Sequence, residues 1–253
     1  MAHQATPVRT ARLGRTLGPE PGTVSGAVLL LPGGQEVSTR RPSPVRATAS
    51  VRALGRRLAG AGRSEGLAVH VVHYRYRGWN GDEAHQARDA AWAVEEVVRR
   101  YGDVPVCLAG LDMGGRAALH AAGHETVNSV VAIAPWLPEA DVAATPEPVR
   151  QLAGRRVLIV HGTNDERTDP ELSFRFAERA KKANRDVCRF EVHADGHGLR
   201  QYRDEVLALT ADFVMGSLFG RVFSRPVQDA LAAPPPLGLR MPLAAGFGRT
   251  LRR

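Results

Sequence analysis

Cysteine is scarce in this chain of 253 residues, and both thiols, Cys107 and Cys188, lie inside predicted buried strands. Two buried thiols cannot build a disulfide framework, so the simple expectation is a reducing, cytoplasmic compartment. The sequence contains neither a Cys-x-x-Cys nor a His-Glu-x-x-His pattern. We therefore expect no metal site and no cofactor.

Long apolar runs are also missing. No run approaches the roughly 18–20 residues that a membrane-spanning helix needs. The N-terminus carries Arg9, Arg12 and Arg15 but lacks the apolar segment of a secretory signal. The expectation is a chain with no transmembrane segment and no export signal.

Acidic residues are fewer than basic ones, 26 against 34, which gives a formal net charge of +8. Residues 219–253 hold six arginines and one acid, Asp229, and so carry +5 of that charge. No nucleic-acid motif accompanies them, so we expect a basic tail and no nucleic-acid partner. Binding of nucleic acid or a membrane surface through this tail is a minor alternative hypothesis.

What the chain does have is a regular alternation of short apolar runs and helical patterns. Strands are predicted at 27–31, 67–74, 104–109, 129–134, 156–160 and 187–192. Helices are predicted at 45–61, 83–100, 116–122, 170–182 and 201–218, with Asp82 as the cap of the second. This order predicts an α/β fold with a doubly wound, mostly parallel sheet.

Three segments are expected along the chain. Residues 1–22 form a flexible lead-in, and residues 23–218 form the α/β domain. Residues 219–253 are rich in Pro and Arg and are expected to be disordered. Ligands of such a domain bind where the loops gather at the carboxyl ends of the strands.

An unusual turn follows the third predicted strand. The apolar run ends in Gly110-Leu111-Asp112-Met113-Gly114-Gly115, and an Ala-rich helical stretch follows. Gly-x-nucleophile-x-Gly at a strand-to-helix turn is the pattern of a nucleophile elbow, whose central residue is usually Ser. The glycines allow the tight turn that raises the central side chain above the sheet.

Two further motifs follow later strands: His-Gly-Thr-Asn-Asp at 161–165, and Asp-Gly-His at 195–197. With the elbow, they resemble the α/β-hydrolase superfamily, in particular its small, lidless serine hydrolases and dienelactone-hydrolase-like members. The resemblance covers about residues 24–218 and implies an α/β-hydrolase fold without a sizeable lid. It further implies Asp112 as nucleophile, Asp165 as acid and His197 as base.

The same resemblance assigns a loop for stabilising negative charge. The loop at 31–34, Leu-Pro-Gly-Gly, matches the family's oxyanion loop. The resemblance then places the donor amides on Gly34 and Met113.

An aspartate at the elbow changes the chemistry. A carboxylate with an ordinary pKa of about 3.9 is already ionised at neutral pH. Its attack on an ester would form an anhydride and expel an alkoxide, which is unfavourable. Its attack on a saturated carbon that carries a halide or a strained epoxide oxygen gives an aspartyl ester, which water activated by His197 then hydrolyses. The sequence therefore favours hydrolysis of an epoxide or an activated C–X bond in a small-molecule substrate.

Haloalkane dehalogenases and epoxide hydrolases of the superfamily also carry Asp at the elbow, and this chain departs from both. Met113 stands where those dehalogenases have Trp, and the link at 135–155 lacks the tyrosine pair of an epoxide-hydrolase lid. Four aromatic residues are candidates for the substrate wall, although each also fits simple packing: Tyr74, Tyr76, Trp79 and Trp136.

Several alternatives stay open at this point. Two carboxylates flanking His197 would hold it as an imidazolium and disable it as a base, which favours a non-catalytic, ligand-binding pseudo-hydrolase. A lyase or cyclase that uses Asp112 as general acid/base is a further alternative. Asp169 is a fallback for the acid, whereas His161 is expected to be structural.

Overall fold

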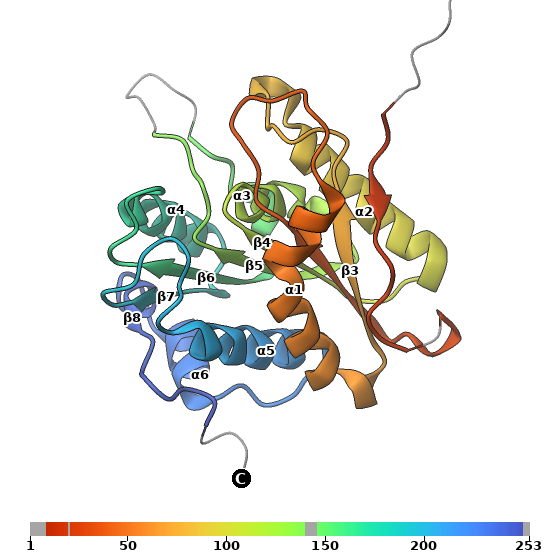
Figure 1. Ribbon diagram of the computed structural model, residues 1–253. Helices are drawn as coiled ribbons and strands as arrows, with labels where there is room; N and C mark the ends of the chain where they lie inside the picture. The colour runs from red at the N-terminus through yellow and green to blue at the C-terminus, as the bar shows by residue number, and fades with distance from the viewer. Residues whose placement is uncertain (1–8, 20, 140–145, 250–253) are drawn as a thin grey trace, which may run out of the picture.

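The protein was analysed as a computed structural model that describes residues 9–19, 21–139 and 146–249 (Figure 1). In this part of the chain a sheet of eight strands runs in the order β1-β3-β2-β4-β5-β6-β7-β8. The strands are β1 Arg12–Leu13, β2 Gly26–Leu31, β3 Leu67–His73, β4 Val106–Leu111, β5 Val127–Ile133, β6 Arg156–Gly162, β7 Val187–Val192 and β8 Met241–Pro242. Every pairing is parallel except that of β1 with β3.

Helices cover both faces of the sheet (Figure 1). They are α1 Pro44–Ala61, α2 His85–Tyr101, α3 Met113–His120, α4 Pro170–Ala183, α5 Arg203–Phe219 and α6 Arg225–Ala232. The helices α1, α5 and α6 share one apolar core with the sheet, and α2, α3 and α4 share the other. Because the central strands are buried on both faces, their sequences are continuous apolar runs.

The α/β prediction is confirmed, and each predicted strand and helix is present with its ends displaced by three residues at most. The predicted cap at Asp82 is wrong. The residue before α2 is Ala84, at φ 42°, and no side chain caps this helix. Asp82 instead lies in a short 3-10 turn, Gly81–Glu83, because the chain makes that turn before the α-helix begins.

The expectation of a disordered tail is wrong for residues 219–249. Val227 and Ala230 of α6 are fully buried, and β8 extends the sheet beside β7. Lys181 Nζ donates to the carbonyl oxygens of Ala230 at 3.0 Å and Leu231 at 3.2 Å, which ties down the last turn of α6. The tail folds because it covers apolar surface and an otherwise open sheet edge; residues 250–253 lie outside the described residues.

Part of the tail's charge is paired with acids of the α/β domain. Arg240 pairs with Glu171 at 3.0 Å and with Glu191 at 3.2 Å. Arg221 pairs with Glu65 at 2.6 Å. The positive charge that stood out in the sequence therefore serves, at these positions, to fasten the tail.

The lead-in is also more ordered than expected. Arg12 and Leu13 pair antiparallel with β3, and the amide of Leu17 donates to the carbonyl oxygen of Val69 at 2.9 Å. The segment thus covers the outer edge of β3, which would otherwise expose unpaired backbone groups. Residues 1–8 and 20 lie outside the described residues. Among the described helices none is long and apolar enough to cross a bilayer.

Candidate active site

Asp112 lies in the tight turn between β4 and α3. Its backbone adopts φ 55° and ψ −124°, which a non-glycine residue accepts at a cost on the order of 1–3 kcal/mol. A Cβ on Gly110 would lie 2.0 Å from the carbonyl oxygen of Gly114, and one on Gly114 would lie 2.1 Å from that of Leu31. Only glycine fits at these two positions, so the elbow has the geometry that its sequence pattern predicts.

The carboxylate of Asp112 rests on backbone amides. The residue is almost fully buried, and the backbone amides of Met113 and Gly34 lie close enough to its carboxylate to stabilise the charged form. Arg167 Nη2 lies 3.1 Å from Asp112 Oδ2. Burial raises the pKa of Asp112 above its ordinary value, and the charge of Arg167, the charge of His197 and the two amides offset part of that rise. The carboxyl group thus occupies the position expected for an oxyanion.

The loop that carries Gly34 is held in place before any ligand binds. The amide of Gln35 donates to the carbonyl oxygen of Arg77 at 3.0 Å, and the amide of Trp79 donates to that of Gln35 at 2.8 Å. The buried side chain of Gln86 donates to the same Arg77 oxygen at 3.1 Å. A donor amide fixed in this way stabilises negative charge without reorganising.

The other two residues predicted for the site lie beside Asp112. His197 Nδ1 is 2.9 Å from Asp165 Oδ2, and His197 Nε2 is 4.0 Å from Asp112 Oδ1. The second distance is longer than a hydrogen bond but within the range of an ion pair, so His197 is hydrogen-bonded to the Asp165 carboxylate and also faces the charge of Asp112. The structure therefore brings the three residues together in the order Asp165, His197, Asp112.

Asp165 is the most heavily hydrogen-bonded carboxylate of the site. It accepts from the amide of Arg167 at 2.9 Å, from the amide of Thr168 at 3.0 Å and from the hydroxyl of Thr168 at 2.6 Å. The buried His161 lies with Nε2 3.2 Å from Asp165 Oδ2. Burial raises the pKa of Asp165, but these hydrogen bonds outweigh it and hold the pKa below its usual range. Asp165 therefore stays ionised beside His197.

Two of these residues were missed as parts of the site. His161 was expected to be structural, yet its ring lies against the carboxylate of Asp165 and helps to hold it in place. Its position at the start of the His-Gly-x-x-Asp motif is the one feature of the sequence that could have indicated this role. Arg167 has no signal beyond lying two residues after Asp165. Asp169, the fallback acid, instead caps α4 by accepting from the amide of Glu171 at 2.8 Å.

Two cavities meet at Asp112 and Arg167. The larger, of about 510 Å³, lies between the middle of α1 and the start of α5 and also reaches His197. The smaller, of about 360 Å³, extends over the loop that carries Gly34 and is also lined by Glu36, Met113 and Trp136. Both volumes suit a small organic molecule.

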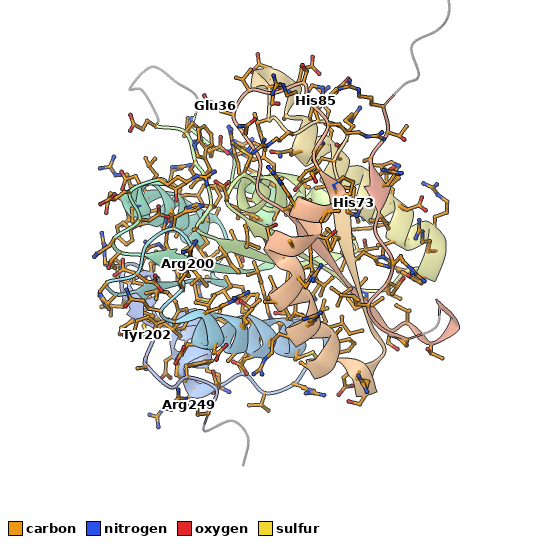
Figure 2. All side chains as sticks on the ribbon, in the orientation of Figure 1. Glu36, His73, His85, Arg200, Tyr202 and Arg249 are labelled. Carbon is orange, nitrogen blue, oxygen red and sulfur yellow. The ribbon has the colours of Figure 1, made fainter. Side chains whose placement is uncertain are left out.

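Among the four aromatic residues proposed for the substrate wall, Trp136 lines one of these cavities and the other three do not. Tyr74 is buried in the core and Tyr76 packs edge-on against His85, which lies at the upper rim in Figure 2. Trp79 is also buried, with the guanidinium of Arg116 3.9 Å from its ring centroid. The prediction that these residues line the substrate site is therefore wrong for Tyr74, Tyr76 and Trp79. Their rings pack in the core or against His85 and Arg116 instead.

The carboxylate of Glu147 fixes the link between β5 and β6 to helix α3. Glu147 accepts from Arg116 at 2.5 Å and also bonds His120. Burial alone would raise the pKa of Glu147, but these two partners lower it to about 2. Within the described part of this link the regular structure is a single 3-10 turn, Arg150–Leu152, and no sizeable lid is formed. Residues 140–145 lie outside the described residues.

Chemically, the site offers the carboxyl group of Asp112, a histidine whose Nε2 lies 4.0 Å from that group, two backbone amides and a guanidinium. No group of three or more His, Cys, Asp or Glu side chains in the described segments is placed to hold a metal ion.

The fold and the arrangement of the site define an α/β-hydrolase-fold protein. Among solved structures, esterase 2 of Thermogutta terrifontis matches with a TM-score of 0.62 and 19% identity, over 85% of this chain and 92% of that one. An esterase of Pyrococcus furiosus matches with a TM-score of 0.59 and 15% identity, over 77% and 83%. An α/β serine hydrolase homologue from Coxiella burnetii matches with a TM-score of 0.55 and 16% identity, over 81% and 90%. No protein-family model and no curated protein sequence matches the chain.

Proposed function

We propose that this protein hydrolyses a small molecule at a saturated carbon, an epoxide or an activated C–X bond, through an ester formed on Asp112. One observation carries the proposal: the Asp112 carboxylate rests on the amides of Gly34 and Met113, with the His197–Asp165 pair beside it. In the first step a carboxylate oxygen bonds to the substrate carbon. The C–X or C–O bond breaks, and its electron pair leaves with X or with the epoxide oxygen.

The second step restores the enzyme. His197 Nε2 takes a proton from water as the water oxygen attacks Cγ of Asp112. The ester's carbonyl oxygen becomes an oxyanion held by the two amides, which are already aimed at the carboxyl group. Collapse of this intermediate expels the alcohol oxygen, which receives the proton from His197, and leaves Asp112 as a carboxylic acid that holds one water oxygen. This acid then releases its proton to solvent, which balances the halide set free or the proton that the epoxide alkoxide takes up from water. Asp165 orients the ring and stabilises its charged form.

In this proposal Arg167 stabilises the leaving group. It takes the place of the Trp or the tyrosine pair that related enzymes use and this chain lacks. Its guanidinium lies 3.1 Å from Asp112 Oδ2, next to the carbon that would be attacked. Because arginine stays protonated, it stabilises a departing halide or alkoxide by charge and hydrogen bonding rather than by giving up a proton.

The structural neighbours that are esterases favour ester hydrolysis as the reaction. Asp112, in place of a serine nucleophile, argues against assigning that reaction to this protein. At identities of 15–19% the likeness supports the fold rather than the reaction. An Asp112→Ser variant would place a hydroxyl beside His197. If it gains activity on a nitrophenyl ester while the parent has none, the difference between the two reactions resides in this side chain.

A non-catalytic binding protein is the second candidate, favoured by the Arg167–Asp112 ion pair that neutralises the carboxylate. The deciding experiment is a single turnover of phenyl glycidyl ether or a bromoalkane in ¹⁸O-labelled water. The covalent route puts label into the peptide that contains Asp112, and Asp112→Asn abolishes both turnover and label. Turnover without label refutes the aspartyl ester, and the failure of both substrate types favours binding alone.

A further inference from the structure

We propose that the larger cavity at Asp112 recognises substrates that carry an anionic oxyacid group on an apolar body, and that Arg200 and Arg203 bind the anion. This inference rests on the proposed function for its kinetic test and is independent of it for its binding test. It narrows the proposed substrates from epoxides and C–X compounds in general to those that also carry an acidic group.

The charges that line this cavity are unbalanced. Its lining includes Arg167, Arg200, Arg203 and His197, whereas Asp112 is the sole acidic residue that lines it among the described residues. Arg167 is already paired with Asp112 at 3.1 Å. Neither Arg200 nor Arg203 takes part in any ion pair between described residues. Two guanidinium groups are therefore left to bind an anion.

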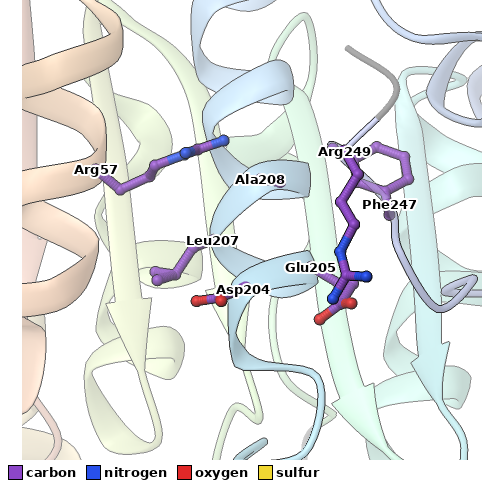
Figure 3. A pocket seen from close by; sticks show the side chains of 8 residues that line it. Arg57, Asp204, Glu205, Leu207, Ala208, Phe247 and Arg249 are labelled. Carbon is purple, nitrogen blue, oxygen red and sulfur yellow. The ribbon is translucent and has the colours of Figure 1, made fainter. Parts of the chain in front are cut away.

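The nearest acids in the sequence face elsewhere. Asp204 and Glu205 directly follow Arg203, but both line a separate cavity of about 450 Å³ beside Phe247 (Figure 3). Glu205 is further occupied there by accepting from the amide of Gly246 at 3.0 Å. In the first turn of α5, Arg203 thus lines the cavity at Asp112, whereas the two acidic side chains line the other cavity. The dipole of α5 adds positive potential at this same N-terminal end of the helix.

The backbone beneath both arginines is fixed. Asp195 is buried, and its carboxylate accepts from the amides of Gly196 at 2.9 Å, Arg200 at 3.2 Å, Gln201 at 3.0 Å and Tyr202 at 3.2 Å. This turn carries His197 and Arg200 and leads into α5; Figure 2 labels Arg200 and Tyr202 there. The backbone of Arg200 is therefore fixed by the turn that also carries His197, and Arg203 follows at the start of α5.

Most of the remaining side chains of the lining are apolar, and Ser50 is a polar exception. Side chains from α1, the ends of β4 and β5, and α5 contribute the apolar part: Leu54, Leu111, Ile133, Leu199, Val206 and Leu207. An apolar wall with two arginines at its rim fits a ligand with an acidic head and a hydrocarbon or aromatic body. Guanidinium groups bind carboxylates and phosphates through charge-assisted hydrogen bonds, so the cavity should prefer an anionic ligand to an uncharged one of the same shape.

The kinetic test compares two ethers of the same shape, carboxyphenyl glycidyl ether and its uncharged carbamoyl counterpart. We expect the wild type to favour the carboxylate about tenfold in kcat/KM, since each charge-assisted bond is partly screened at these exposed side chains. The ratio should fall towards one in an R200Q/R203Q double variant. Arg52→Gln, an exposed and unpaired arginine of α1 outside the cavity, is the matched control and should keep the wild-type ratio.

The binding test needs no turnover. Phenoxyacetate and phenoxyacetamide are titrated calorimetrically into the wild type, the double variant and Arg52→Gln. Tighter binding of phenoxyacetate that is lost only in the double variant supports the anion site even when neither ether is hydrolysed, in which case the proposed function fails alone. Equal affinity for the two ligands, or a preference that survives in the double variant, overturns the anion site even when both ethers are hydrolysed. A phosphonophenyl ether in the kinetic series tells whether a phosphate-like group or a carboxylate is preferred.

Discussion

A methyl group added at Gly33 would test whether the Asp112 carboxylate lies against the oxyanion loop. A Cβ built at this position would lie 2.8 Å from Asp112 Oδ2 and 3.2 Å from Asp112 Cβ. Gly33 does not adopt a positive φ, so the backbone itself accepts alanine. The substitution therefore acts through the carboxylate rather than through the fold of the loop.

The size of the effect follows from the geometry. An ordinary contact begins at 3.4 Å, so the carboxylate must retreat by about 0.6 Å. A misplacement of about 1 Å at a reacting group can cost on the order of 10²-fold in rate. In proportion, Gly33→Ala should lower kcat by about tenfold to twentyfold.

The assay is the rate of ester formation on Asp112 with phenyl glycidyl ether, measured beside the melting temperature. Gly60→Ala is the matched control, because a Cβ there meets nothing within 4 Å. It should keep full activity and stabilise α1 by about 0.5–1 kcal/mol, since alanine is the better helix former. In an Asp112→Ser background the clash with Oδ2 is gone, so Gly33→Ala should reduce the acquired esterase activity less. A Gly33→Ala enzyme with wild-type kcat and an unchanged melting temperature would refute the described position of the carboxylate.

Three further predictions concern the other charges of the site and its surroundings. Asp165→Asn should lower kcat by about 10⁴-fold, because His197 loses the carboxylate that orients it; a loss below tenfold would contradict this role. Burial raises the pKa of Asp112 and Arg167 opposes that rise, so Arg167→Gln should move the acidic limb of the pH–rate profile for ester formation to higher pH, and an unmoved limb would count against the ion pair. Glu147 has a folded pKa of about 2 against an ordinary value of 4.5, so the stability it contributes is complete above about 4.5 and is lost as the pH falls towards 2. Unfolding by urea across this window should show a smaller loss for Glu147→Gln than for the wild type, and equal losses would refute the linkage.

Much of the fold follows from local patterns in the sequence. Burial on both faces makes a parallel strand continuously apolar, and that pattern predicted each central strand and the helices between them. The elbow was predictable for a similar reason, because only glycine fits at 110 and 114 where backbone atoms approach within about 2 Å of a Cβ position. Since loops at the carboxyl ends of parallel strands share one edge, the motifs also predicted that Asp112, Asp165 and His197 would meet.

The tertiary structure alone decided what surrounds those three residues. Arg167 approaches Asp112 across 55 positions of sequence. Arg200 and Arg203 line the cavity at Asp112, whereas the two acids that follow Arg203 line another one. The tail looked disordered because its composition is rich in Pro and Arg, yet α6 and β8 fill gaps that only the assembled sheet creates. Local periodicity reports which residues are buried, whereas the partner of a charged or aromatic side chain depends on contacts between distant segments, and only the folded chain brings these together.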